Sequence, residues 1–108
     1  MRLYHFSDAR NRESIRWRGL IPHRPGRDGN WRCMWLVPVY GWGVVRQPRA
    51  IYVWPEDPRP KRPTDTRDVW MFDYEGPIEP DRYCQGIGSL LIRERIPPAR
   101  LQLLAAAA

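Results

Sequence analysis

The pattern of apolar and polar positions at the start of the chain predicts a strand that leads directly into a helix. Leu3, Tyr4 and Phe6 are strand-forming residues, and one polar ring, His5, lies among them. The next two residues, Ser7 and Asp8, carry side-chain oxygens suited to capping the free N–H groups of a helix. The histidine is therefore expected near the point where the strand gives way to the helix.

The expected helix runs through Arg18 and ends at Gly19, since glycine suits the left-handed position that follows a helix. Its apolar positions predict a buried stripe, and the charged positions around them predict a solvated face. The stripe comprises Ile15 and Leu20, with Trp17 nearby, and the solvated residues are Arg10, Arg12, Glu13, Arg16 and Arg18.

Later stretches rich in β-forming residues predict further strands. The three expected strands are residues 49–55, 68–74 and 89–94, with the third as the last strand of the fold. In the first of them, Ile51 and Val53 fall on one face, and Tyr52 and Trp54 fall on the other. The two aromatic side chains could line a pocket together, or they could simply cover the sheet.

The segments between these strands are of two kinds. Residues 31–45 are the most apolar part of the chain and are expected in the core, although their tryptophans could also form a stacking platform for a base. Residues 23–30, 56–66 and 75–81 are rich in proline, glycine and charged residues, which predicts exposed connections.

Three stretches of the chain resemble parts of the ADP-ribosyltransferase superfamily fold. LYHFSDARNRESIRWRGLIPH, residues 3–23, is similar to the strand and helix that open that fold, and AIYVW, residues 50–54, resembles its second signature strand. GSLLIRERIPPARLQLL, residues 88–104, is similar to its last strand and the IPP-x-x-L segment that follows. The resemblance implies an α+β fold with two small antiparallel β-sheets and an N-terminal helix. It also implies a single domain over residues 1–104, followed by a low-complexity alanine tail at 105–108.

The same resemblance implies NAD as the cofactor. It assigns His5 to the adenosine-side ribose and Tyr52 to the nicotinamide end, and makes both of them candidate catalytic residues. The implied cofactor-binding residues are Tyr4, His5, Ser7, Tyr52 and Trp54. On composition alone, a single histidine between strand residues is more often a satisfied structural group than a ligand contact.

Ser89 stands where active members of the superfamily carry a glutamate, and it is the third candidate catalytic residue. A carboxylate there stabilises the positive charge that develops as nicotinamide leaves, and losing it costs about a hundredfold to a thousandfold in rate. Glu94 lies about 16 Å further along an extended strand and at the opposite parity. Glu75, Glu79 or Asp81 from the preceding loop could replace the missing acid. We therefore expect weak or absent catalysis, as in a pseudoenzyme.

Two alternatives remain open. RNA 2′-phosphotransferases share the superfamily fold and act without that glutamate, but only His5 falls in register with their Arg and His set. A formal net charge of +6, with Lys61 the only lysine, also fits a different class of protein. Arginine suits phosphates and stacked bases, although a GC-rich genome enriches arginine too. The alternative function is a non-catalytic module that binds a host protein or nucleic acid through an Arg/Trp-rich surface, as in an accessory protein of a phage or other mobile element.

Metal and membrane signals are weak. Cys33 and Cys84 lack CxxC spacing, and His5 and His23 add no matching ligand cluster, so reduced thiols and no metal are expected. No apolar run approaches the roughly 20 residues needed to span a bilayer, and the N-terminus lacks the apolar core of a signal peptide. A cytoplasmic location is therefore expected.

Overall fold

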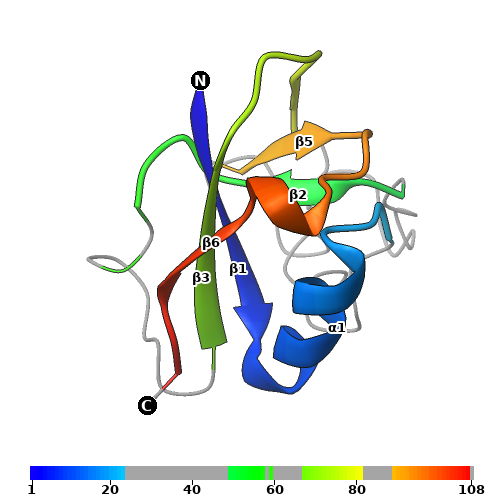
Figure 1. The fold of residues 1–108 in the computed structure, drawn as a ribbon. Coiled ribbons are helices and arrows are strands. Elements are labelled where there is room, and N and C mark those ends of the chain that lie inside the picture. The colour runs from blue at the N-terminus through cyan, green and yellow to red at the C-terminus, as the bar shows by residue number, and fades with distance from the viewer. Residues whose placement is uncertain (24–48, 58, 60–66, 82–88, 108) are drawn as a thin grey trace, which may run out of the picture.

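The computed structural model describes residues 1–23, 49–57, 59, 67–81 and 89–107. They form an α+β fold with two small antiparallel sheets and a helix near the N-terminus, as predicted (Figure 1). The strands are β1 (Arg2–Asp8), β2 (Ile51–Val53), β3 (Arg67–Asp73), β4 (Glu79–Pro80), β5 (Leu90–Ile92) and β6 (Gln102–Ala105). The helices are α1 (Arg12–Arg18) and the short 3-10 helices η1 (Ala9–Asn11) and η2 (Pro98–Arg100).

Several sequence predictions fall outside the described residues. They are the apolar segment 31–45, nearly all of the basic loop 23–30, most of the loop 56–66, and the two cysteines, Cys33 and Cys84. Within the described residues, no helix is long and apolar enough to cross a membrane.

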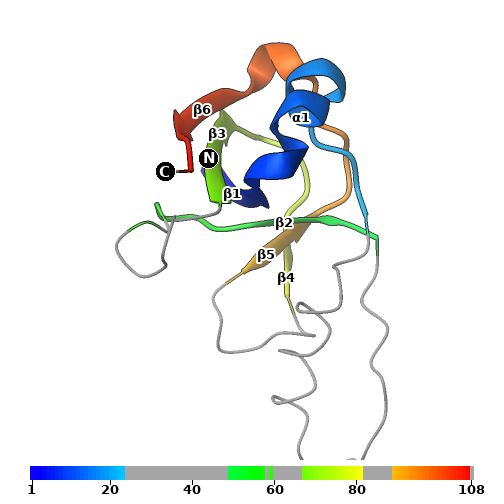
Figure 2. The ribbon, with the colours of Figure 1, turned by 90° about the horizontal axis from the view of Figure 1, so that it is seen from below.

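The six strands form two three-stranded sheets with the orders β1-β3-β6 and β2-β5-β4, and every pairing is antiparallel. In Figure 1, β1 and β3 run side by side, and β2 and β5 lie across them. Figure 2 shows from below that β2 passes between β1 and β5. The sheets are joined at an isolated bridge between Tyr4 and Trp54, whose N–H groups each donate to the other's carbonyl oxygen at 2.9 Å.

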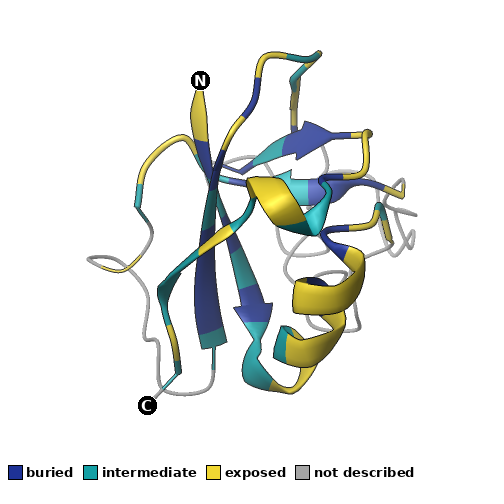
Figure 3. Ribbon diagram, viewed as in Figure 1, coloured by how far each residue is buried: buried dark blue, intermediate teal, exposed yellow. Residues whose placement is uncertain are grey.

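The core takes side chains from both sheets and from the helix. Along β1, Leu3, His5 and Ser7 are buried and alternate with half-buried residues, as a strand with one covered face requires (Figure 3). The apolar core cluster comprises Leu3, Ile15, Leu20, Ile51, Val53, Trp70, Phe72, Tyr74, Ile92 and Ile96. Strands that are distant in the sequence are therefore held together by one buried layer.

Local sequence signals set the turn from β1 into the helix and the helix end. Asp8 accepts a hydrogen bond from the Arg10 N–H at 3.0 Å and caps η1, which confirms the capping prediction for Asp8. Ser7 is instead buried, and its hydroxyl lies 3.5 Å from the Asp8 carbonyl oxygen. Gly19 follows α1 with φ of 79°, in the left-handed region predicted for it. A Cβ there would lie 2.0 Å from the Ile96 carbonyl oxygen, so close packing requires glycine as well.

Two predictions for the helix are wrong. Ile15 and Leu20 are buried as predicted, but Trp17 is 83% exposed. Trp17 lies two positions after Ile15, about 200° around the helix, and therefore on the opposite side. Arg12 is not fully solvated, because its side chain reaches the buried carboxylate of Asp68.

The C-terminal region contains more strand than the sequence predicts. The strand expected to be last is β5, but β6 follows it and pairs with β3, with Ala105 opposite Val69. β6 ends at Ala105, so the first residue of the alanine tail is paired in the sheet. β4 likewise lies in a segment expected to be an irregular turn, where it pairs with β5.

Candidate functional site

The candidate site is the join between the two sheets. β1 meets the end of β2 at the Tyr4–Trp54 bridge, and β2 pairs along its length with β5. β1, β2 and β5 are therefore neighbours in space. Every residue proposed from the sequence as catalytic or cofactor-binding lies in or beside these three strands.

His5 is buried at this join, and its ring connects the two strands. The residue is 7% exposed, and Nδ1 donates a hydrogen bond to the carbonyl oxygen of Tyr52 at 2.8 Å. A carbonyl oxygen can only accept, so the neutral ring carries its proton on Nδ1 and its lone pair on Nε2. The pKa of His5 is lowered from 6.5 to about 4, chiefly by burial. The hydrogen bond to Tyr52 raises the pKa in part, and the nearby His23 ring lowers it further. The ring is therefore neutral at pH 7, and Nε2 is a hydrogen-bond acceptor.

His23 brings the chain after the helix alongside His5. Its side chain is exposed, but the two rings lie edge to face, with centroids 6.4 Å apart and planes at 89°. The N–H of His23 donates to the carbonyl oxygen of Ala50 at 3.2 Å, and the reverse bond measures 3.0 Å. The sequence predicts His23 in an exposed loop, and its side chain is exposed. Its place beside His5 depends on this backbone bridge, which no local motif signals.

Tyr52 and Trp54 lie on the predicted face of β2. Ile51 and Val53 are completely buried, whereas Tyr52 and Trp54 are half-buried. This alternation confirms the period-two prediction for the strand. The two aromatic residues are therefore accessible in part, as a stacking surface needs to be, and they also cover the sheet.

The predicted cofactor-binding residues divide into two groups. Tyr4 is directly opposite Trp54 across the bridge, and directly opposed residues of an antiparallel pair project to the same face. Tyr4, Tyr52 and Trp54 thus share one face by strand alternation. His5 and Ser7 alternate with Tyr4 and lie on the other, buried face of β1. The two groups meet where the His5 ring reaches the Tyr52 backbone.

Ser89, the third candidate catalytic residue, is held by a carboxylate. It immediately precedes β5, and its hydroxyl donates to Asp81 Oδ2 at 2.6 Å. Ser89 is 8% exposed and Asp81 is 5% exposed, so the pair is shielded from water. Of Glu75, Glu79 and Asp81, the three acids that the sequence offers in the loop before position 89, Asp81 is the one whose carboxylate contacts Ser89.

The other acids near the candidate site are placed differently. Glu79 pairs with Arg93 at 2.7 Å on the surface. Glu75 and Glu94 are exposed. Within the described residues, no group of three or more histidine, cysteine or acidic side chains is arranged to hold a metal ion.

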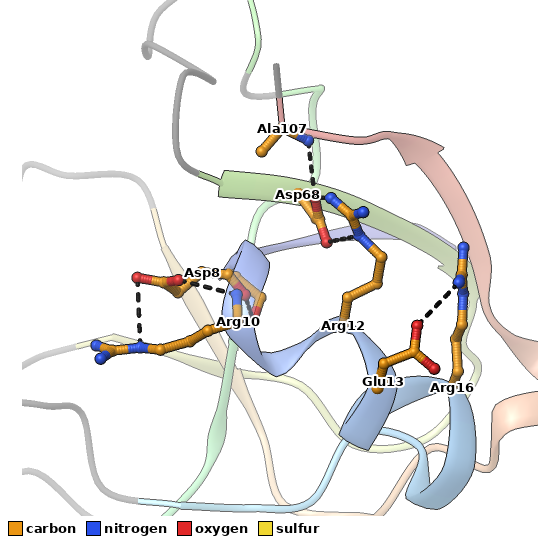
Figure 4. Close-up of polar contacts among 8 residues, drawn as sticks. Asp8, Arg10, Arg12, Glu13, Arg16, Asp68 and Ala107 are labelled. Atoms are coloured by element: carbon orange, nitrogen blue, oxygen red, sulfur yellow. Dashed lines mark hydrogen bonds and ion pairs between the residues drawn. The ribbon is translucent and has the colours of Figure 1, made fainter.

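Sequence reasoning missed a buried ionic cluster between the helix and the first sheet. Asp68 is completely buried on β3 and accepts hydrogen bonds from Arg12 and from the backbone N–H of Ala107 (Figure 4). The register of β3 contained a signal, because Asp68 has the same parity as the buried Trp70 and Phe72. The cluster lies opposite Ser7 in the sheet and supports the strand that carries His5.

The chain matches no protein-family model, no curated protein and no solved structure.

Proposed function

We propose that this chain is an ADP-ribosyltransferase-like domain that binds NAD at the join of β1 and β2 and has weak or no transferase activity. One observation carries the proposal: the 2.8 Å hydrogen bond from His5 Nδ1 to the Tyr52 carbonyl oxygen. It links the two residues that the resemblance assigns to opposite ends of the cofactor, although they are 47 positions apart in the chain.

The arrangement of the three resembling segments supports the proposal. The first and last segments meet at Leu20 and Ile96, whose N–H groups each donate to the other's carbonyl oxygen at 2.9 Å. Arg95 adds two hydrogen bonds to the Arg18 carbonyl oxygen. The middle segment pairs with the first segment at the Tyr4–Trp54 bridge and with the last segment through β2. Segments that resemble one superfamily separately thus assemble into one unit.

The chemistry of His5 suits a ribose. A neutral imidazole whose Nδ1–H is already engaged offers Nε2 as an acceptor, and a ribose hydroxyl can donate to it. A protonated ring would offer a donor instead. The lowered pKa therefore keeps His5 in the state that accepts a hydrogen bond at neutral pH.

The aromatic group supplies the other kind of contact that NAD needs. Nicotinamide and adenine are flat rings, and half-buried aromatic side chains can stack against them. Tyr52 and Trp54 belong to the strand face that Tyr4 shares, and the His5 ring, on the other face of β1, reaches the Tyr52 backbone. We assign this face to the nicotinamide end of the cofactor.

The Ser89–Asp81 contact argues for weak or absent catalysis. Ser89 is neutral and donates its hydroxyl hydrogen to Asp81, so it cannot stabilise a developing positive charge as a carboxylate does. Asp81 carries the nearby negative charge, one side chain further from the position that the resemblance assigns to the glutamate. We therefore expect NAD binding to be easier to detect than transfer.

Isothermal titration calorimetry with NAD tests the proposal, using two variants of His5. Asparagine can imitate the Nδ1–H donor to Tyr52 but lacks an acceptor at the Nε2 position, and glutamine reaches that position with its side-chain oxygen. We expect His5→Asn to fold and to lose NAD binding, and His5→Gln to retain more of it. An absence of heat with the wild-type protein, or wild-type affinity in His5→Asn, would refute the NAD site.

A further inference from the structure

We infer that the outer face of α1 is a docking surface for single-stranded nucleic acid, on which Trp17 stacks against an unpaired base. Trp17 is 83% exposed, compared with 61% for Met1 and 47% for Ile21, the other exposed large hydrophobic residues in the described ranges. Figure 3 shows α1 as a largely exposed element on the outside of the fold. A single exposed apolar residue needs no explanation by itself, but Trp17 is surrounded by cations.

Arginines flank Trp17 on both sides. Arg16 and Arg18 are exposed neighbours in the same helix. Arg16 pairs with Glu13 at 3.2 Å, with side-chain exposures of 53% and 85%. Such a solvated pair contributes little free energy, so its guanidinium can exchange the carboxylate for a phosphate. For Arg18, the described residues include no carboxylate within ion-pair distance.

A distant part of the chain adds cations at the same end of α1. Arg95 donates from Nε and Nη2 to the Arg18 carbonyl oxygen at 3.0 and 2.7 Å, which fixes its guanidinium at the C-terminus of the helix. This contact uses a carbonyl group and leaves the positive charge of Arg95 available. η2 packs against α1 and ends with the exposed Arg100. The surface therefore combines the exposed indole of Trp17 with four arginines from two segments of the chain, Arg16, Arg18, Arg95 and Arg100.

This combination favours single-stranded nucleic acid over the other anionic partners. Arginines neutralise phosphates without regard to sequence, and an accessible indole stacks on any base whose face is free. A duplex hides its base faces, so it could use the arginines but not Trp17. An acidic protein segment would likewise pair with the arginines, but it offers the indole a flat ring only where it carries an aromatic side chain, whereas every nucleotide of a single strand carries one.

Fluorescence anisotropy of a labelled 15-nucleotide single strand, as DNA and as RNA, tests this inference at two salt concentrations. We expect Trp17→Ala to weaken binding about tenfold or more, and Trp17→Tyr to restore part of the loss. Because Trp17 is exposed, both variants should keep the wild-type urea midpoint. Arg18→Glu should weaken binding more than its charge-matched control, Arg2→Glu, since Arg2 is exposed at the far end of β1.

Four results would overturn the inference. They are no binding of either single strand at low salt, wild-type affinity in Trp17→Ala, equal losses in Arg18→Glu and Arg2→Glu, and a duplex that binds as tightly as the single strand. None of these measurements involves NAD. Failure here is therefore separate from failure of the proposed cofactor site, and His5→Asn should bind the oligonucleotide like the wild type.

Discussion

Arg12 at the start of α1 forms a two-point ion pair with Asp68 on β3. Its Nε and Nη2 atoms each donate to a different carboxylate oxygen, and both distances are 2.7 Å. Asp68 is completely buried, and the backbone N–H of Ala107 adds a third hydrogen bond at 2.8 Å. Arg12 and this N–H outweigh the effect of burial and hold the pKa of Asp68 below its ordinary value. One carboxylate thus ties together the helix, the first sheet and the chain after β6.

Replacing Arg12 should destabilise the fold strongly. Arg12→Ala leaves a buried carboxylate without its main partner, so we expect the free energy of unfolding to fall by about 3 kcal/mol. Arg16→Ala removes an exposed pair with Glu13 and should cost less than about 1 kcal/mol. Urea titration followed by circular dichroism measures both. Similar losses in the two variants would show that the Asp68 cluster is not a major support of the fold.

The burial of His5 should make stability depend on pH in a defined window. Its pKa falls from 6.5 in the unfolded chain to about 4 in the fold, so below pH 6.5 the unfolded state binds more protons. The contribution of neutral His5 to the free energy of unfolding is complete above pH 6.5 and is lost as the pH falls towards 4. Between pH 7 and pH 5 the loss should be about 2 kcal/mol. Urea titrations at the two pH values should show this loss in the wild type, and His5→Asn should lack most of it.

Gly19 should tolerate no side chain. Gly19→Ala combines a φ of 79° with a Cβ 2.0 Å from the Ile96 carbonyl oxygen, so the helix end and the backbone after β5 would have to separate. We expect a loss of at least about 2 kcal/mol. Ser14→Ala, at an exposed position of the same helix, should change stability by no more than about 0.5 kcal/mol. Thermal unfolding compares the pair, and near-equal midpoints would contradict the packing described for Gly19.

Introducing a glutamate at position 89 should require a change at Asp81 as well. Ser89→Glu alone would bring two buried carboxylates together, and their repulsion would raise a pKa or distort the site. Ser89→Glu combined with Asp81→Asn keeps a single negative charge and supplies a hydrogen-bonding neighbour. We expect the double variant to release nicotinamide from NAD about a hundredfold faster than the wild type. Chromatography of the reaction products measures the rate. A folded, NAD-binding double variant with no gain would refute the assignment of position 89.

Features encoded by neighbouring residues could be predicted from the sequence. The passage from β1 into the helix depends on the cap at Asp8 and the stop at Gly19, which are each determined within a few residues. The alternation of Ile51 with Tyr52 likewise needs only the two-residue period of a strand. The predicted pair of small antiparallel sheets followed from the resemblance, and the described residues form such a pair.

Features that depend on a distant partner could not be predicted. β6, Gln102–Ala105, pairs with the edge of β3, and no residue in that short segment indicates its distant partner. The Ser89–Asp81 bond joins the ends of two short strands, and three acids in that region were equally good candidates from the sequence. Trp17 was misplaced because a helix of seven residues has room for little more than one buried position, and Ile15 occupies it.

Nitrogen-15 NMR of the histidine rings tests directly whether His5 Nε2 accepts a hydrogen bond from NAD. The chain has only two histidines, so the ring signals can be assigned with His23→Gln. At pH 7 we expect a neutral His5 ring with its proton on Nδ1, and an Nε2 resonance that moves as NAD is added while Nδ1 keeps its bond to Tyr52. A proton on Nε2 in the free protein, or a His5 spectrum unchanged by millimolar NAD, would contradict this role of His5.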